Sequence, residues 1–359
     1  MKTHLNSFHA SLWLLIAVCI AASSASSLGE RSPRYSVALL GKLGTDNPYF
    51  LPWVINNKGE VVGAGRDSPL LYRDGVIHNL GHFEPPVWYA TITAINDRGD
   101  ILGIANAESA TSFILPYPLL SLTRASMLPV PHLIAWDINN HGAIVGWAWN
   151  SEEKRTFPLV YHEGRVTELP GLVPGRAAFA LAINNRGQIL GNSPFPEDDI
   201  FYASHAVIWS DGGIQDLGVL PGYPYSVARD INDRGEAVGY CTDHIGLNCA
   251  FLYRRGVMEA LPFPPHGIHT YATDINNAGD VIIAAYLENQ ADDTYWLYSD
   301  GALHDLKDIV TRATGWPIYW LLAHGINDRG QIIATAHYHN GRGGSVLQGI
   351  LLTPNHRRP

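Results

Sequence analysis

Charged residues are scarce in this 359-residue chain: Asp, Glu, Lys and Arg make up 16% of it, whereas 46% of the residues are hydrophobic. This composition excludes a disordered protein and provides enough apolar material for a large core. Basic clusters are also lacking, because acidic residues outnumber basic ones 33 to 24 and the formal net charge is −9. A nucleic-acid partner is not expected, since binding to phosphates requires concentrated positive charge.

Long apolar runs are lacking too, except near the N-terminus. There an apolar run of 11 residues, 12–22, follows Lys2 and precedes small residues through Ser27. A membrane-spanning helix needs about 20 residues, so this run is too short. The pattern is typical of a signal peptide over residues 1–27 and predicts a secreted or periplasmic protein with no membrane span after signal removal. A lipid anchor at Cys19 is less favoured, because Val18 is bulky for a lipoprotein signal.

Only three cysteines are present, and Cys19 lies within the predicted signal peptide. The remaining two, Cys241 and Cys249, flank a seven-residue loop between two apolar runs. An even number of cysteines in an exported chain predicts a disulfide that pins this hairpin. A metal site is less favoured here, because no histidine or further cysteine stands at the spacing of a tetrahedral site.

Turn residues are abundant, and they occur in a repeat. The 35 glycines and 23 prolines are spread along the chain, which favours many short β-strands separated by turns. A motif of the form Ile-Asn-(Asn or Asp)-x-Gly occurs seven times, and its copies are 40 (55 to 95) to 51 (275 to 326) residues apart. That period is typical of propeller blades. The copies begin at Ile55, Ile95, Ile138, Ile183, Ile231, Ile275 and Ile326.

Each copy predicts a hairpin between the first two strands of a blade. Asn at the first turn position and Gly at the fourth, as in Asn232-Asp233-Arg234-Gly235, fit a type I turn followed by a left-handed glycine. A third apolar run, a second turn and a fourth strand follow, so four strands make one blade. The second turn recurs in five units, as at Ser210-Asp211-Gly212, whereas the second unit departs from this pattern.

The two ends of the chain predict how the ring closes. Only two further strands follow the seventh motif, and residues 35–44 resemble the fourth strands of other units. The sequence therefore predicts an all-β, seven-bladed propeller over residues 35–354, made of four-stranded antiparallel blades. An N-terminal strand completes the last blade and removes an exposed sheet edge. Residues 28–34 are expected to be a short linker and residues 355–359 a tail.

The repeat motif, together with the stretch HAVIWSDGGIQDLGVLPG at residues 205–222, resembles the HAF-type extracellular repeat family, named for its His-Ala-Phe triplet. The corresponding triplets here are His205-Ala206-Val207 and Cys249-Ala250-Phe251. The resemblance covers essentially the whole mature chain and implies an exported propeller. It implies no catalytic residue, because the family is defined by its scaffold.

Propeller geometry predicts which loops share a face. Loops entering each first strand and loops between second and third strands lie on one face, and the Ile-Asn turns lie on the other. Aromatic residues at the strand entries, with two tryptophans from one of the loops, are therefore expected to form a rim around the channel mouth. These ligand-binding candidates are Tyr49, Phe50, Trp88, Tyr89, Trp147, Trp149, Phe179, Tyr225, Tyr271, Tyr319 and Trp320.

The same loops contribute polar residues, among them Glu152, residues 197–199 and Asp292. Tyr and Trp beside carboxylates suit sugar rings or extended polar ligands. The alternative is that the aromatics cover the inner strands and fill gaps between blades. His337 and His339 would face the same side of a strand and could share a metal, but no third ligand is suitably spaced, so no metal is predicted.

Three functions remain open at this point. The aromatic set favours a binding or interaction module for a glycan, an extended polymer or a protein. A secreted glycan hydrolase or lyase that uses rim carboxylates and histidines is the first alternative, and a purely structural or protein-docking propeller is the second. No nucleophile elbow, zinc-protease motif, phosphate-binding loop or cofactor fingerprint is present, so the catalytic residues stay unassigned and no cofactor is expected.

Overall fold

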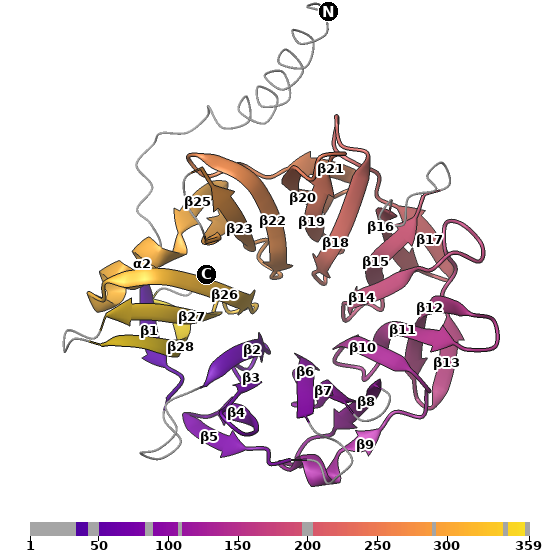
Figure 1. Cartoon of the computed structure of the whole chain (residues 1–359), viewed down its shortest axis with the longest axis horizontal. Helices are drawn as coiled ribbons and strands as arrows, with labels where there is room; N and C mark the ends of the chain where they lie inside the picture. The colour runs from indigo at the N-terminus through magenta and orange to yellow at the C-terminus, as the bar shows by residue number, and fades with distance from the viewer. Residues whose placement is uncertain are drawn as a thin grey trace, which may run out of the picture.

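The computed structural model is a ring of seven four-stranded antiparallel sheets around a central channel (Figure 1). It describes residues 34–41, 50–82, 89–106, 110–195, 204–288, 292–339 and 344–355. The predicted seven-bladed all-β propeller is confirmed. The predicted signal peptide lies outside the described residues. No helix within these ranges is long and apolar enough to span a bilayer.

The strands of each blade follow one another from the channel outward. Blade 1 contains β2 (Leu51–Ile55), β3 (Val61–Ala64), β4 (Pro69–Arg73) and β5 (Val76–Asn79). Blade 2 contains β6 (Tyr89–Ile95), β7 (Ile101–Asn106), β8 (Ala110–Leu115) and β9 (Ser126–Met127). Blade 3 contains β10 (Leu133–Ile138), β11 (Ile144–Asn150), β12 (Arg155–His162) and β13 (Arg165–Glu168). Blade 4 contains β14 (Phe179–Ile183), β15 (Ile189–Pro194), β16 (Ser204–Ser210) and β17 (Gly213–Asp216).

The remaining three blades repeat this order. Blade 5 contains β18 (Tyr225–Ile231), β19 (Ala237–Thr242), β20 (Asn248–Arg254) and β21 (Val257–Ala260). Blade 6 contains β22 (Gly267–Ile275), β23 (Val281–Leu287), β24 (Thr294–Ser299) and β25 (Ala302–Asp305). Blade 7 contains β26 (Ile318–Ile326), β27 (Ile332–His339), β28 (Ser345–Pro354) and, as its outermost strand, β1 (Tyr35–Leu39).

The N-terminal strand closes the ring as predicted. Strand β1 pairs antiparallel with β28, with Tyr35 opposite Pro354 and Leu39 opposite Ile350. A hydrogen bond from Asn355 N to Arg34 O (2.8 Å) extends this pairing at its end. Blade 7 therefore combines strands from both ends of the chain, and its outer edge depends on β1.

Every innermost strand carries a bulge just before its Ile-Asn motif. In blade 5, for example, the register between β18 and β19 shifts between Ala228 and Asp230. Strands β22 and β26 carry a second bulge near their beginning, between Gly267 and His269 and between Ile318 and Trp320. A bulge leaves one residue unpaired and re-aims neighbouring side chains. The second bulge of β26 is therefore the local feature that shapes the site described below.

Apolar side chains fill the spaces between adjacent blades. The layer between blades 4 and 5 contains Leu190 from one blade and the fully buried Phe251 from the next. Burying such a side chain stabilises the fold by about 1.5–3 kcal/mol. The core is thus a circular set of similar layers, which fits a repeat in which each blade contacts its neighbours.

One α-helix, which the sequence analysis did not predict, interrupts the β architecture between blades 6 and 7. Helix α2 (Leu306–Thr314) begins after Asp305, whose side chain accepts hydrogen bonds from the amides of Lys307 and Asp308. It ends at Gly315, which is left-handed with φ 72°. Its buried side chains, among them Ile309 and Val310, pack into the core of blade 7. In blade 2, a short 3-10 helix, η1 (Leu122–Arg124), precedes the two-residue β9, which explains the irregular unit.

The predicted disulfide is not present in the structure. Cys241 and Cys249 lie opposite one another on β19 and β20 and both are buried, but no bond joins them. The Sγ of Cys241 accepts a hydrogen bond from Leu220 N (3.3 Å) and lies 3.5 Å from Met258 Sδ. Burial raises the pKa of the Cys241 thiol to about 12, which keeps it protonated. Because the thiolate is the reactive form, this environment opposes oxidation.

Candidate functional site

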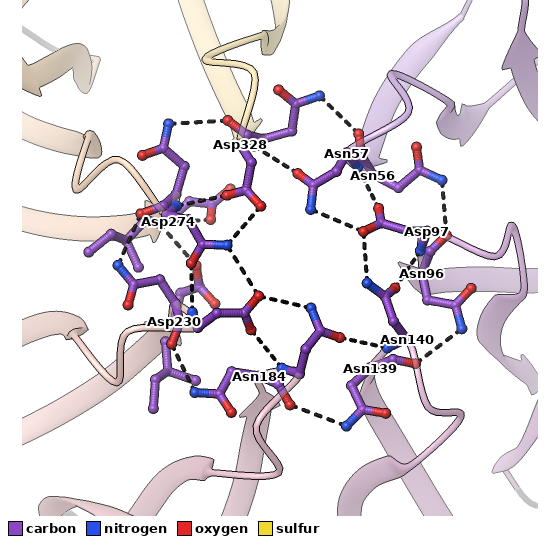
Figure 2. A pocket seen from close by; sticks show the side chains of 18 of the residues that line it. Asn56, Asn57, Asn96, Asp97, Asn139, Asn140, Asn184, Asp230, Asp274 and Asp328 are labelled. Carbon is purple, nitrogen blue, oxygen red and sulfur yellow. Dashed lines mark hydrogen bonds between the residues drawn. The ribbon is translucent and has the colours of Figure 1, made fainter. Parts of the chain in front are cut away.

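The Ile-Asn turns converge on the channel axis and line a cavity of about 170 Å³ (Figure 2). Each turn has the predicted geometry: in blade 1, Asn56 N donates to Glu60 O and Gly59, with φ +83°, donates to Asn56 O. The interpretation of the motif as a hairpin turn is confirmed. The same residues also connect the blades, which the sequence analysis did not predict.

The first Asn of each motif forms a closed circle of hydrogen bonds. Its Nδ2 donates to the backbone carbonyl of the first Asn in the next blade, at 2.8–3.2 Å. The link from Asn327 to Asn56 O (2.9 Å) joins blade 7 to blade 1 and completes the circle. Each of these side chains also accepts amide hydrogen bonds within its own turn, as Asn56 Oδ1 does from Lys58 and Glu60.

The second motif residue forms another closed circle. Its backbone N–H donates to the side-chain oxygen of the second residue in the next blade, at 2.7–2.8 Å. Carboxylates and amides are interspersed, so that no two carboxylates are adjacent; Asp97 Oδ2, for example, accepts from both Asn57 and Asn140. In order around the ring these residues are Asn57, Asp97, Asn140, Asn185, Asp233, Asn277 and Asp328. We call them the second-position ring.

Three aspartates stand immediately before the isoleucine of their motifs, in the channel wall. Asp137 accepts hydrogen bonds from Ile138 N and from Ile183 N of the next blade, both at 2.8 Å. Desolvation by the surrounding protein raises the pKa of Asp137 to about 6. These carboxyls therefore satisfy backbone amides across the blade boundary.

Asp274 makes the same bonds to Ile275 N and Ile326 N, and its carboxyl lies beside that of Asp230. Desolvation, followed by repulsion from Asp230, raises the pKa of Asp274 well above its ordinary value. Gly325 leaves room for this carboxyl, because a Cβ there would lie 2.9 Å from Asp274 Oδ2. On this face of the propeller, polar groups are engaged chiefly with one another.

A second cavity, of about 210 Å³, lies between blades 6 and 7 on the loop-rich face. The entry of β24, the end of β25, the first turn of α2 and the start of β26 all contribute to it. Its lining residues are Asp292, Asp293, Thr294, Tyr295, Asp305, Lys307, Tyr319, Trp320 and Leu321. It contains three of the residues singled out in the sequence: Asp292, Tyr319 and Trp320. We call it the blade 6–7 cavity.

The second bulge of β26 brings the two predicted aromatics together. Ile318 pairs with Tyr338 and Trp320 with His337, so Tyr319 is the extra residue. Consecutive side chains of a regular strand point to opposite faces. Here the rings of Tyr319 and Trp320 both contact His337, with centroid distances of 5.3 and 5.4 Å, and both border the cavity. Tyr319 is 54% exposed, which leaves its ring accessible to a ligand.

The blade 6–7 cavity has an excess of negative charge. Three carboxylates, those of Asp292, Asp293 and Asp305, face one ammonium group, that of Lys307. None of the three forms an ion pair with a basic side chain in the part of the chain that the structure describes. The Nζ of Lys307 instead donates to the carbonyl oxygen of Tyr319 at 3.1 Å.

Two groups in this cavity have raised pKa values. Desolvation, partly offset by the amide hydrogen bonds of the helix cap, raises the pKa of Asp305. Burial, with a smaller contribution from Asp293, raises the pKa of Tyr295 to about 12. Tyr295 is therefore a neutral phenol at physiological pH and can donate a hydrogen bond to a ligand.

Of the other predicted rim residues, those that the structure describes do not line this cavity, and two of them belong to the core. Phe50 is fully buried among apolar residues of blades 1 and 7. Tyr225 is 7% exposed and packs edge-on against His244. For these two residues the prediction of an exposed rim was wrong, because the strand entry turns their rings into the protein. The packing interpretation describes them better.

Three further candidates fill the joints between neighbouring blades. Trp147 and Phe179 pack edge to face across blades 3 and 4, with centroids 5.5 Å apart. Tyr271 packs against Tyr240 of blade 5 at 5.1 Å. Trp149 is 43% exposed on β11. Tyr49, Trp88, the side chain of Tyr89 and loop residues 197–199 lie outside what the structure describes.

The histidine pair does not assemble a metal site. Among the described residues, no group of three or more His, Cys, Asp or Glu side chains is placed to hold a metal ion. His337 contacts the aromatic rings that border the cavity. Tyr295, Asp305 and Lys307 of the blade 6–7 cavity are not among the residues predicted from the sequence. The signal that could have found them is the 51-residue spacing before the last motif, the longest in the chain, which contains α2.

The seven four-stranded blades define the fold as a β-propeller. Solved structures with the same fold are similar to this chain. The chain is similar to the β-propeller domain of the Trilobed protease from Pyrococcus furiosus, with 13% identity, a TM-score of 0.56, and coverage of 88% of this chain and 96% of that one. It is also similar to Pyrococcus horikoshii acylaminoacyl peptidase, with 14% identity, a TM-score of 0.50, and coverage of 83% of this chain and 52% of that one.

At these identities the likeness shows the fold alone. The Pyrococcus furiosus domain is described as having an open velcro topology. In the present chain, β1 completes the last blade. No protein-family model and no curated protein sequence matches the chain.

Proposed function

We propose that this protein is an exported, non-catalytic binding module that holds one sugar unit of a glycan in the blade 6–7 cavity. The proposal is carried by the bulge that sets Tyr319 and Trp320 beside one another at a cavity that also contains carboxylates. Aromatic faces stack on sugar rings, and carboxylates accept hydrogen bonds from sugar hydroxyls. The signal-like residues 1–27 and the resemblance to HAF-type repeats support an extracytoplasmic location.

Exposure favours a binding role over a packing role for Tyr319, whereas Trp320 is half-buried beside it. An aromatic that serves only the core is enclosed, as Phe50 is at 0% exposed, whereas Tyr319 is 54% exposed at the mouth of a cavity. Because drug-sized ligands occupy about 300–1,000 Å³, a cavity of about 210 Å³ suits one ring of a longer polymer.

The enzyme alternative is less well supported. A glycoside hydrolase needs two carboxyls beside the scissile bond, one of which has a raised pKa and acts as the acid. Asp305 has a raised pKa, but its Oδ1 accepts two amide hydrogen bonds as the cap of α2. A group held in this way is suited to a fixed structural and electrostatic role.

The test measures glycan retention and product formation on the same samples. The purified protein is passed over a glycan array, and a reducing-end assay is run on each glycan that it retains. We expect retention without product. Trp320→Ala should weaken binding about tenfold, which corresponds to about 1.4 kcal/mol of lost contact.

The control variant is Trp136→Ala, which removes a tryptophan that is 42% exposed on β10 and does not line the cavity. This variant should bind glycans like the wild type. Equal affinities for wild type and Trp320→Ala would contradict the proposed site. Release of reducing ends would assign the enzyme alternative instead.

A further inference from the structure

We infer that the glycan held in the blade 6–7 cavity carries free amino groups, so that the protein selects a cationic amino sugar over its N-acetylated form. This inference rests on the proposed function and specifies its ligand. Two properties of the cavity support it: exposed carboxylates contributed by blade 6 and aromatic rings contributed by blade 7.

The carboxylates of this cavity differ from those in the channel in what they contact. In the second-position ring, Asp97 accepts two amide side chains as well as a backbone N–H. In the blade 6–7 cavity, Asp292 and Asp293 are exposed and, within the described residues, form no ion pair with a basic side chain. A ligand ammonium group would supply the missing counter-charge.

The one lysine of the cavity, Lys307, attracts the carboxylate of Asp305, but it forms no ion pair with any of the three carboxylates. Lys307 Nζ donates to the Tyr319 carbonyl, which holds the ammonium at the β26 side of the cavity. Asp308, on the first turn of α2, adds further negative charge near Asp305. The local field therefore repels carboxylate-bearing glycans and attracts cations.

The aromatic rings add a second attraction for the same charge. A cation within about 6 Å of a Trp or Tyr ring face is attracted by the negative charge density of that face. Tyr319 and Trp320 border the cavity from consecutive positions and offer a broader surface than one ammonium group needs. That breadth favours an amino sugar, whose ring stacks while its ammonium pairs with a carboxylate, over an isolated lysine side chain.

The experiment compares two oligosaccharides that differ only in acetylation: a glucosamine oligomer and its fully N-acetylated counterpart. Calorimetric titration at mildly acidic pH and low salt should give at least tenfold tighter binding of the free-amine form. Added salt should reduce this preference, because the cavity opens to solvent and its charges are screened. Similar affinity for both oligomers, or tighter binding of the acetylated one, would overturn the inference and leave the proposed function intact.

Variants that remove negative charge test whether the carboxylates of this cavity cause the preference for the free-amine oligomer. The double variant Asp293→Asn and Asp305→Asn should lose the preference for the amine, and it should still fold because Asn also caps helices well. The control Asp211→Asn removes one negative charge from an exposed turn in blade 4 and should retain the preference. Loss of the preference in Asp211→Asn would mean that overall charge, and not this cavity, selects the ligand, which would overturn the inference.

Two further results separate the inference from the function it rests on. Binding of neither oligomer, together with no retention on the array, would overturn the proposed function itself. A lysine-rich peptide that displaces the glucosamine oligomer at equal concentration would show that the cavity recognises cationic protein segments, which would overturn the glycan assignment.

Discussion

The two faces of this propeller use carboxylates in opposite ways. On the Ile-Asn face, Asp97 and Asp137 accept hydrogen bonds from amides of their own and neighbouring blades. On the loop-rich face, Asp292 and Asp293 reach solvent in a cavity that the exposed ring of Tyr319 also borders, and no described basic side chain pairs with them. Polar groups that satisfy one another hold the ring together, whereas groups that lack an internal partner are available to a ligand. The predictions at Asn327 and at the channel carboxyls test this division directly.

The largest effect is expected from removing β1. Deletion of residues 35–39 leaves the backbone of β28 unpaired along the outer edge of blade 7 and opens that side of the ring. We expect loss of soluble monomer, measured by size-exclusion chromatography and thermal melting. An unchanged melting temperature would show that the Asn circle alone closes the propeller.

A smaller but clear loss of stability is expected for Asn327→Ala. This change removes the link to Asn56 O and leaves Arg329 N and Gln331 N without their side-chain acceptor. Each buried polar group left unsatisfied costs about 1–3 kcal/mol, so the melting temperature should fall by roughly 5–10 °C. Trp320→Ala is the control from the other face and should lower the melting temperature much less. Equal losses in both variants would contradict the division between the faces.

The channel carboxyls should make stability depend on pH. The pKa of Asp137 is raised from 3.8 to about 6 in the folded protein, and that of Asp274 is also raised, so the native state binds more protons than the unfolded state between about pH 4 and pH 6. Stability should therefore rise as pH falls from 8 toward 5, and the Asp137 shift alone contributes about 1.4 kcal/mol of this rise, roughly half of the amount that full protonation would give.

Asp230→Asn tests the origin of this pH dependence. It removes the negative charge beside Asp274 and keeps an oxygen that can accept from Ile275 N. The variant should be more stable than the wild type at pH 8, and its melting temperature should vary less between pH 8 and pH 5. A profile with the same slope as the wild type would mean that Asp230 and Asp274 do not interact in this way.

The smallest effect concerns the cysteines, which lie away from both sites. Because Cys241 is buried with a pKa of about 12, the native protein should react very slowly with thiol reagents. After denaturation without reductant, both Cys241 and Cys249 should titrate as thiols. Failure to detect them would restore the disulfide that the sequence suggested.

The sequence was sufficient to predict the fold because its signals are local and repeated. The Asn and Gly of each motif determine the hairpin turn, and the missing fourth strand after Ile326 indicated that residues near Tyr35 complete the last blade. Helix α2 was missed, although Asp305 as cap, the apolar Ile309 and Val310, and Gly315 as terminator are ordinary helix signals. These helix signals were overlooked because each blade was expected to follow the previous one without an intervening helix.

The site was predicted only in part, for two physical reasons. The direction of a side chain at a strand entry depends on bulges. No sequence pattern around Tyr319 predicts its bulge, so Phe50 and Tyr319 looked equivalent in the sequence. Within the two circles, the bonds between consecutive blades join residues 40–51 positions apart, as in the bond from Asn56 to Asn96 O, and the bonds that close the circles join residues 271 positions apart. The turn within each motif already accounted for the presence of its Asn. The sequence of one motif therefore did not predict a hydrogen bond to the motif of the next blade.

The order of carboxylates and amides in the second-position ring makes the repeats non-interchangeable. A circle of seven holds at most three carboxylates without placing two side by side, and Asp97, Asp233 and Asp328 already reach that number. Asn57 lies between two of them, Asp97 and Asp328. Exchanging the second motif residues of blades 1 and 2 would therefore set a new carboxylate directly against Asp328. Each blade carries the same motif, yet its place in the circle determines which version of the motif it can carry.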